Sequence, residues 1–329
     1  MSPDPKAEPT LKGRRAWIIT DGKAGMEVQV AGVAQALETN FEIKRVQPHG
    51  FWRFGSPWIG IDPQERFGRE GSQFAPPWPD IALATGRLSI PALRAVRKAS
   101  PETYSVIIQD PRTGTGSADL IAVPDHDRLR GENVIHTLTA PHGFSQDRLA
   151  RLRAKVPKDI AALPGPRVAV VLGGPNSIYS FTGEDSARLA GALASMAALN
   201  ASFLITSSRR TPAHALEAVL EATRNAPRNV WDGKGANPYE SWLAHSDMFV
   251  VSADSINMTG EACASAKPVY VFEPTGGSAK FTRFHESLRR YGATRILPES
   301  FSQLETWTYA PLDSASQIAA EIERRWRKR

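Results

Sequence analysis

The feature that most constrains the fold is a regular alternation of short apolar runs with longer amphipathic stretches along the whole chain. The runs are apolar almost throughout, which is typical of strands buried on both faces of a parallel sheet. Strands that alternate with helices predict an α/β fold, because parallel neighbours need a crossover connection. The expected strands are residues 16–20, 41–47, 80–84, 104–109, 120–123, 133–137, 167–172, 202–206, 229–231, 248–251 and 268–272. The expected helices are residues 27–38, 90–98, 146–154, 184–199, 212–225, 239–245, 257–266, 280–291 and 314–327.

Residues 157–166 divide these elements into two series and carry three prolines and a glycine, a composition typical of a linker. A chain of 329 residues also suits two domains of ordinary size. We expect two Rossmann-like domains with parallel sheets that face each other across a cleft. The expected bounds are a disordered tail at 1–12, domains at 13–158 and 159–310, and a C-terminal helix in 311–329 that can pack back on the first domain.

The composition indicates the cellular compartment of the protein and limits the kinds of partner it can have. The single cysteine, Cys263, cannot form an internal disulfide, which favours a reducing compartment. No apolar run reaches the roughly 18–20 residues that span a bilayer, and the first ten residues lack an apolar signal core. We therefore expect a cytoplasmic protein. The net charge of +6 includes a basic C-terminal end, which either touches an anionic membrane at its inner face or stays solvated. No nucleic-acid-binding signature accompanies the charge, so we expect no nucleic acid partner.

The segment from Val250 to Ala262 indicates a strand, a polar turn and a helix. This pattern places Asp254, Ser255 and Asn257 at the carboxyl end of a strand and the amino end of a helix, where exposed N–H groups favour a phosphate or a sugar hydroxyl. Glu261, farther along the helix, could reach a ribose hydroxyl. An equally good interpretation is a helix capped by Asp254 or Ser255.

Two other loops of the second series share this placement. The run 171–177 ends a strand in Gly173, Gly174 and Asn176, and the glycines would let a ligand approach the backbone. The run 205–212 ends a strand in Ser207, Ser208 and Arg209, which suit a diphosphate because a guanidinium can donate two parallel hydrogen bonds. Arg209 and Arg210 could instead be a solvated pair at a helix start. Tyr239 begins a short helix and either lies near a base or sugar or only packs.

The first series offers two candidates for acid–base chemistry. Asp21 follows the first strand in the turn Asp21–Met26 and is a possible general base, or a turn residue that binds local N–H groups. His142 follows the last strand of the series and titrates near neutrality, although a lone histidine is more often structural. Neither loop is a Walker A or a G-x-G-x-x-G motif.

An aromatic stretch that includes Phe51, Phe54, Trp58 and Phe67 is broken by prolines and glycines. It is too irregular for a clean helix. It is either a hydrophobic acceptor or membrane-touching loop, or a satellite core under a long loop.

Seven short motifs occur in order between Trp17 and Phe272 and together resemble the mitochondrial fission "elongated mitochondria" family, whose bacterial members are described as glycosyltransferases. They are residues 20–26, 84–87, 109–112, 140–142, 206–212, 237–239 and 254–258. The resemblance implies a GT-B architecture, with the acceptor on the first domain and a nucleotide-sugar donor on the second. The second half is also similar to distant GT-B donor sites such as those of Kdo transferases, which implies a donor pocket formed by Gly173, Gly174, Ser207, Arg209, Ser255, Asn257 and Glu261.

These observations predict a metal-independent glycosyltransferase that needs no cofactor besides its substrate. It would move a sugar from a nucleotide diphosphate sugar to a lipid or other cell-envelope acceptor, with Asp21 or His142 taking the acceptor proton. The alternative is a non-catalytic GT-B-like adaptor at a membrane surface that recruits a division or fission partner, as the plant relatives do. A nicotinamide-dependent enzyme is disfavoured because the glycine fingerprint and its acidic residue are missing.

Overall fold

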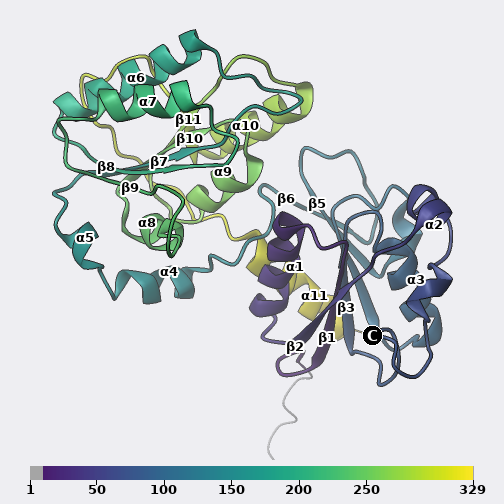
Figure 1. The fold of residues 1–329 in the computed structure, drawn as a ribbon. Coiled ribbons are helices and arrows are strands. Elements are labelled where there is room, and N and C mark those ends of the chain that lie inside the picture. Colours follow the sequence, from purple (N-terminus) through teal and green to yellow (C-terminus); the bar gives the residue numbers. More distant parts are fainter. Residues whose placement is uncertain (1–9, 329) are drawn as a thin grey trace, which may run out of the picture. The chain divides into compact units, whose positions relative to one another are not determined.

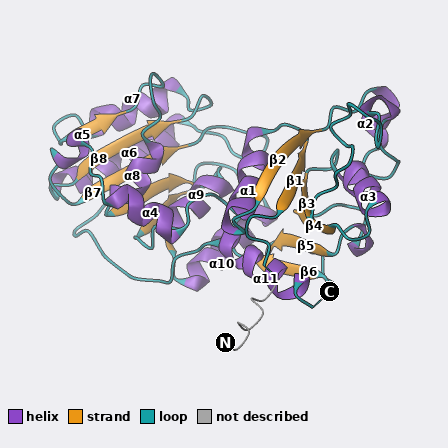
Figure 2. Cartoon of the chain, turned by 90° about the horizontal axis from the view of Figure 1, so that it is seen from below, coloured by secondary structure: helices purple, strands orange, loops and turns teal. Residues whose placement is uncertain are grey.

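A computed structural model describes residues 10–328 and divides the chain into two compact units (Figure 1). The first unit comprises the chain up to Ser145 together with the segment from Asp313 onward, and the second comprises Gln146–Leu312. Each unit holds a six-stranded sheet in which every pair of neighbouring strands is parallel. Helices flank these sheets in Figure 2, so both units are α/β.

The sheet of the first unit has the order β2-β1-β3-β4-β5-β6. Its strands are β1 (Arg15–Thr20), β2 (Asn40–Arg45), β3 (Ile81–Thr85), β4 (Tyr104–Ile108), β5 (Leu120–Pro124) and β6 (Val134–Thr137). Its helices are α1 (Ala24–Ala36), α2 (Gly50–Gly55), α3 (Ile90–Ala99) and α11 (Ser314–Trp326).

The sheet of the second unit has the order β12-β11-β10-β7-β8-β9. Its strands are β7 (Arg167–Leu172), β8 (Ser202–Ser207), β9 (Arg228–Val230), β10 (Met248–Ser252), β11 (Val269–Phe272) and β12 (Thr294–Ile296). Its helices are α4 (Gln146–Arg153), α5 (Lys158–Ala161), α6 (Gly183–Ala198), α7 (Ala213–Ala222), α8 (Tyr239–His245), α9 (Ile256–Cys263) and α10 (Ala279–Tyr291).

The inner strands of each sheet are buried on both faces, which explains why they are apolar almost throughout, whereas the edge strands β2, β6, β9 and β12 are partly exposed. In β1, Ala16 and Ile18 join a core with α1 and α11, whereas Trp17 and Ile19 join a second core with α3. Successive side chains of a strand point to opposite faces, so an inner strand such as β1 contributes to two cores. The predicted α/β class with parallel sheets is confirmed.

The C-terminal helix α11 belongs to the first unit. Ile318 and Ile322 are fully buried in the same core as α1. The start of the described chain is fixed to this helix, because the Leu11 N–H donates to Glu323 Oε1 at 2.8 Å and the Leu11 side chain is fully buried. Residues 1–9 of the expected disordered tail (1–12) lie outside the described residues. At residues 10–12 the expectation of disorder is wrong, because this segment is bound to α11.

The expected linker at 157–166 is instead packed structure. Ile160 and Leu163 are buried with Leu204 and Trp242 in a cluster of the second unit. The prolines and glycine of this segment obscured two apolar residues that lie three positions apart on and just after the short helix α5. The chain passes between the units at Ser145 and Gln146, and again at Leu312 and Asp313, rather than near residue 158.

Two short α-helices and one short strand were not predicted from the sequence. The aromatic stretch begins with a genuine helix, α2, and α5 interrupts the expected linker. The short strand β12 pairs with β11 at one edge of the second sheet. Each has only three to six residues, too few for a helical or strand period to stand out.

Candidate functional site

The candidate site lies in the second unit, where the strand order reverses. From β7 the sheet continues through β8 and β9 on one side and through β10, β11 and β12 on the other. Helices that follow strands on opposite sides of such a point leave room at the carboxyl ends of the strands, where ligands of open α/β sheets bind. The loops after β7, β8 and β10 meet at this edge.

Asp254 joins these loops together. Its carboxylate accepts hydrogen bonds from the Gly174 N–H at 2.9 Å and the Ser252 hydroxyl at 2.7 Å, and lies 3.3 Å from an Arg210 Nη atom. The Asp254 side chain is fully buried. A buried carboxylate surrounded by donors that it satisfies is a structural centre, because removing it would leave those donors unpaired.

The two glycines after β7 serve the packing of these loops. A Cβ atom on Gly173 would lie 2.1 Å from Asp254 Oδ2, and one on Gly174 would lie 2.2 Å from the Arg210 carbonyl oxygen. The space beside both glycines is therefore filled by neighbouring protein. The expectation that they let a ligand approach the backbone is replaced by a close approach of loop to loop.

The two adjacent arginines have different environments. Arg210 donates to the Gly174 and Pro175 carbonyls at 3.0 and 3.1 Å and pairs with Asp254. Arg209 makes no side-chain hydrogen bond or ion pair with any residue between positions 10 and 328, and it lines a cavity. Arg210 thus holds the loops, while the Arg209 guanidinium keeps all its donors available.

That cavity has a volume of about 790 Å³ at the carboxyl ends of β7, β8 and β9, within the range of small-molecule sites. Its wall combines apolar, aromatic and polar side chains. The lining residues are Val171, Leu172, Thr206, Ser207, Ser208, Arg209, Leu216, Leu220, Val230, Trp231, Asp232, Gly233, Asn237, Tyr239 and Met258. An apolar wall with an aromatic ring suits a nucleobase, and the arginine suits a phosphate.

The amino end of α7 adds positive potential near Arg209. This helix begins at Ala213 after the N-cap residue Pro212, and no side chain caps its first N–H groups. Ser208 is partly used by the turn that precedes the helix, because its hydroxyl accepts from the Arg210 N–H and its own N–H donates to Thr211. Helix amino ends and arginine together favour an anion.

Glu261 lies behind the cavity wall rather than on it. Its Oε2 accepts a hydrogen bond of 2.7 Å from the hydroxyl of Tyr239, which does line the cavity. Burial raises the pKa of Glu261 to about 7, even though the Tyr239 hydrogen bond works in the opposite direction. Burial also raises the pKa of Tyr239. The Glu261 carboxyl, in contact with the Tyr239 hydroxyl, is therefore the group that titrates near neutrality at the edge of the cavity.

The remaining predicted residues of the second unit have local structural contacts. Asn176 accepts from the N–H groups of Ile178 and Tyr179 and so closes its own loop. Ser255 is the N-cap of α9, with its hydroxyl accepting from the Met258 N–H at 3.3 Å. Asn257 is exposed in the first turn of that helix. Neither Asn176, Ser255 nor Asn257 lines the cavity.

In the first unit, Asp21 and His142 are both largely enclosed. The Asp21 side chain is 3% exposed and forms an ion pair of 2.6 Å with Lys23. His142 is buried, its Nδ1 accepts from the Phe144 N–H at 3.3 Å, and its backbone packs so closely on α1 that a Cβ on Gly32 would lie 2.7 Å away. Their predicted acid–base roles stay predictions.

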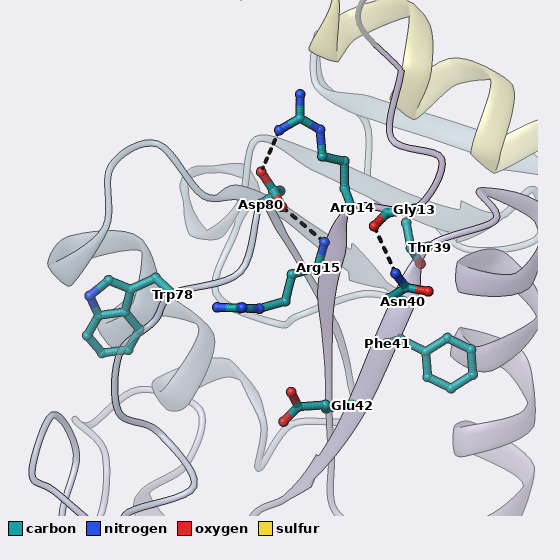
Figure 3. A pocket seen from close by; sticks show the side chains of 9 residues that line it. All are labelled: Gly13, Arg14, Arg15, Thr39, Asn40, Phe41, Glu42, Trp78 and Asp80. Carbon is teal, nitrogen blue, oxygen red and sulfur yellow. Dashed lines mark hydrogen bonds and ion pairs between the residues drawn. The ribbon is translucent and has the colours of Figure 1, made fainter.

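A second cavity of about 850 Å³ lies at the opposite end of the first sheet, where β1 and β2 begin (Figure 3). Its charged groups are engaged with their neighbours, since Asp80 accepts from the Arg15 N–H at 3.0 Å and pairs with Arg14 at 3.4 Å. The Asn40 amide donates to the Gly13 carbonyl at 2.9 Å. The amino ends of parallel strands are not the usual place for a ligand, so we regard this cavity as part of the scaffold.

Sequence interpretation overlooked one wall of the candidate site. Trp231, Asp232 and Gly233 follow the short strand β9, and Leu216 and Leu220 come from α7. The run Asp232–Gly235, with glycines at alternate positions after a strand, is a turn signal that could have marked this loop. The two leucines carried no signal, because leucines on an amphipathic helix usually belong to a core.

The fold matches several solved structures. The UDP-GlcNAc 2-epimerase from Methanocaldococcus jannaschii superposes with a TM-score of 0.54 at 9% identity, over 94% of this chain and 99% of that one. The UDP-GlcNAc 2-epimerase from Neisseria meningitidis bound to UDP-GlcNAc gives 0.52 at 12% identity, over 94% and 100%. A UDP-glucosyltransferase from Polygonum tinctorium gives 0.50 at 12% identity, over 97% and 93%. The molecule is therefore a GT-B-fold protein.

Within that class, the chain belongs to the Mitochondrial fission ELM1 family, whose model matches residues 24–326. The Mitochondrial fission protein ELM1 of Arabidopsis thaliana is 30% identical over 271 residues, which cover 75% of this chain and 64% of that protein. The uncharacterized protein RP120 of Rickettsia prowazekii is 35% identical over 162 residues, 47% of this chain and 45% of that protein. The chain thus spans less than two thirds of the length of these two curated relatives, and the predicted family is confirmed.

The described part of the chain lacks two features. Between residues 10 and 328, no three His, Cys, Asp or Glu side chains gather as a metal site would require. Over the same span, no helix combines the length and the apolar character needed to cross a bilayer.

Proposed function

We propose that the cavity of the second unit binds a nucleotide diphosphate sugar and that the protein transfers the sugar to a hydroxyl acceptor. The observation that carries this proposal is the unpartnered guanidinium of Arg209 on the wall of a cavity of about 790 Å³ at the carboxyl edge of the sheet. A buried nucleotide needs both an apolar wall for its base and a cation for its phosphates, and this cavity offers both.

In the proposed reaction, the bond between the sugar carbon and the diphosphate oxygen breaks, and a bond from the acceptor oxygen to that carbon forms. Arg209 and the amino end of α7 would stabilise the negative charge that develops on the departing diphosphate. These groups offset charge without a metal ion. The acceptor hydroxyl would lose its proton to Asp21 or His142, as predicted from their positions after strands of the first unit. We further propose a lipid or cell-envelope acceptor and a cytoplasmic location, with no cofactor besides the nucleotide sugar.

The first test is calorimetric titration with UDP, ADP, GDP and CDP, each in EDTA and then in Mg²⁺. We expect one diphosphate to bind equally well in both conditions. Arg209→Ala should weaken that binding roughly 10- to 100-fold, because a hydrogen bond to a charged group contributes about 1.5–3 kcal/mol. Lys234→Ala removes the same charge from a nearby exposed loop residue outside the cavity wall and should change affinity by less than about threefold. If none of the four diphosphates binds, the donor site is wrong.

A second function is favoured by the family and by the enclosure of Asp21 and His142. The Arabidopsis relative is named a mitochondrial fission protein, and both predicted acid–base groups are enclosed. A non-catalytic GT-B-like adaptor that recruits a fission or division partner at a membrane would need neither group. Release of the diphosphate from the bound nucleotide sugar separates the two functions. An enzyme releases it and loses that activity in Asp21→Asn or in His142→Gln, whereas an adaptor binds the nucleotide sugar without turnover.

A further inference from the structure

The three most exposed large hydrophobic side chains between residues 10 and 328 lie within eight positions of one another. Phe51 is 71% exposed, Phe54 is 79% exposed and Trp58 is 62% exposed. Phe51 and Phe54 are three residues apart on α2 and so lie on one face of that helix, and Trp58 lies in the non-helical turn that follows the helix. We call Phe51, Phe54 and Trp58 the aromatic patch. Single exposed hydrophobic residues are ordinary, but three large ones together mark a binding surface.

The backbone of the segment that carries the aromatic patch is fixed by hydrogen bonds from two arginines. The Arg87 guanidinium donates to the carbonyls of Arg53 and Ser56 at 3.0 and 2.6 Å. Arg94 donates to the carbonyls of Pro57 and Ile59, both at 2.9 Å. Four carbonyls of a short segment are thus fixed by two arginines from the β3–α3 region, beside which α2 lies in Figure 1. The outward direction of the aromatic rings is therefore a property of the packed fold.

The segment that carries the aromatic patch has ionisable side chains of one sign only. Between Pro48 and Ile61 the ionisable residues are His49 and Arg53, and none is acidic. Arg53 is exposed between the two phenylalanines, and its guanidinium has no partner within the described chain. The next acidic residue, Asp62, is buried and accepts from the His49 N–H at 2.8 Å, so it adds no exposed negative surface.

We propose that the aromatic patch docks on an anionic lipid bilayer. Phenylalanine and tryptophan rings partition into the boundary between headgroups and acyl chains, and an interleaved arginine meets the lipid phosphates. A protein partner with an apolar groove would not require the absence of acidic groups, whereas an anionic surface does. The inference does not depend on nucleotide binding in the second unit. It would bring a membrane to the loop that follows β3, at the same edge of the first sheet as Asp21.

The test is flotation of the whole chain with vesicles of phosphatidylcholine alone and of phosphatidylcholine with 30% phosphatidylglycerol, without nucleotide. We expect binding to the anionic vesicles and little to the neutral ones. Phe54→Ser and Phe51→Ser should each weaken binding roughly tenfold. Arg53→Glu should weaken it roughly 5- to 30-fold, through loss of one charge and gain of the opposite one. Ile296→Ser, at a residue 53% exposed on β12 in the other unit, is the matched control and should bind like the unaltered chain.

A second readout locates the contact. Tryptophan emission should shift to shorter wavelength on addition of anionic vesicles, and the shift should be reduced in Trp58→Phe. All substitutions are at exposed positions, so thermal melts should match that of the unaltered chain. Equal binding of the patch variants and the control would overturn the proposal. So would concentration-dependent self-association in sedimentation velocity that Phe54→Ser abolishes without any vesicle binding, because the occupant would then be a second copy.

Discussion

At the carboxyl edge of the first sheet, the charged side chains nearest β1 and β3 are engaged with neighbouring protein groups, whereas at the same edge of the second sheet a cavity is lined by an arginine with no side-chain partner in the described chain. Asp21 binds Lys23, Glu27 binds Arg45 through two hydrogen bonds, and Arg87 is engaged with carbonyls. In the second unit, Arg210 and Asp254 satisfy each other, and this leaves Arg209 available at the cavity.

The comparison shows that similar sheet topology does not decide which edge can bind an anion. Both sheets reverse strand order beside their first strand, and both place polar loops at that point. What differs is that in the second unit an arginine without an internal partner lines a cavity at this edge, whereas the cations beside the first strand of the first unit are paired. In the second unit two arginines are adjacent in sequence but only one is needed to hold the loops, so the other can serve a ligand.

The largest expected effect concerns the two aspartates that follow these strands. Asp254→Ala should lower the free energy of unfolding of the second unit by about 3–5 kcal/mol, because it leaves two buried donors, the Gly174 N–H and the Ser252 hydroxyl, unsatisfied and removes the ion-pair partner of Arg210. Asp21→Ala should cost about 1 kcal/mol or less, because its partner Lys23 is largely in solvent. Urea unfolding of both variants, followed by tryptophan fluorescence, measures this. Equal losses would mean that Asp254 is not the centre of the loops.

The next effect is the pH dependence from Glu261. Its folded pKa of about 7 lies above the ordinary value of 4.5, so the folded state keeps a proton that the unfolded chain releases. Stability from this group is greatest below pH 4.5 and falls as the pH rises to about 7, by on the order of 3 kcal/mol in total. Glu261→Gln stays neutral and should be more stable than the unaltered chain at pH 8, with little difference at pH 4.5.

Glu217→Gln is the control for that experiment, because Glu217 is exposed on α7 and should give the same stability as the unaltered chain at both pH values. The measurement is the urea midpoint of unfolding of each variant and of the unaltered chain, at pH 4.5 and at pH 8. A Glu261→Gln variant that is less stable than the unaltered chain at pH 8 would show that the carboxyl group is ionised and well solvated in the folded protein.

A smaller effect distinguishes the two adjacent arginines. Arg210→Ala should lower the unfolding free energy by roughly 1–3 kcal/mol, since it removes bonds to two carbonyls and to a buried carboxylate. Arg209→Ala should change stability by less than about 0.5 kcal/mol, because its side chain has no partner in the described chain. Thermal melts without nucleotide measure both. The opposite order of stabilities would exchange the roles of the two residues.

The smallest expected effect concerns the pair of Glu27 and Arg45 at the carboxyl edge of the first sheet. Arg45→Ala should raise the pKa of Glu27 toward its ordinary value, because the Arg45 hydrogen bonds are the main cause that lowers it. Any loss of stability should be slight and should shrink as salt is added, since the Arg45 side chain is 56% exposed. Carboxyl carbon chemical shifts followed through a pH titration report the change. An unaltered Glu27 pKa would mean that the pair is not formed in solution.

The sequence predicted the inner strands well because each is a nearly continuous apolar run, whose burial does not depend on a contact with any one distant residue. All eleven expected strands have counterparts, and only the three-residue β12 was missed. The boundary between the two units was harder to predict from the sequence. Pro157 and Gly165 pointed to a linker, but the burial of Ile160 and Leu163 against Trp242 depends on a residue almost eighty positions away.

For the candidate site, the sequence singled out the loops but not the roles within them. Ser207, Ser208, Arg209 and Tyr239 do line the cavity, because the carboxyl ends of parallel strands must share one edge. Gly173, Gly174 and Asp254 were expected at a ligand and instead bind the loops to one another. Trp231 was overlooked because a tryptophan after a short strand carries no local sign of what it faces.

The sequence alone determined the α/β class, the parallel strands and the polar loops at their ends, since these follow from local apolar periodicity. Only the tertiary structure decided which charges are internally paired, because pairing depends on distances between segments far apart in the chain. Arg209 and Arg210 are the same residue type at adjacent positions, so the sequence does not distinguish them. In the fold, Asp254 pairs with Arg210, which becomes a structural residue, and Arg209 is left lining the cavity.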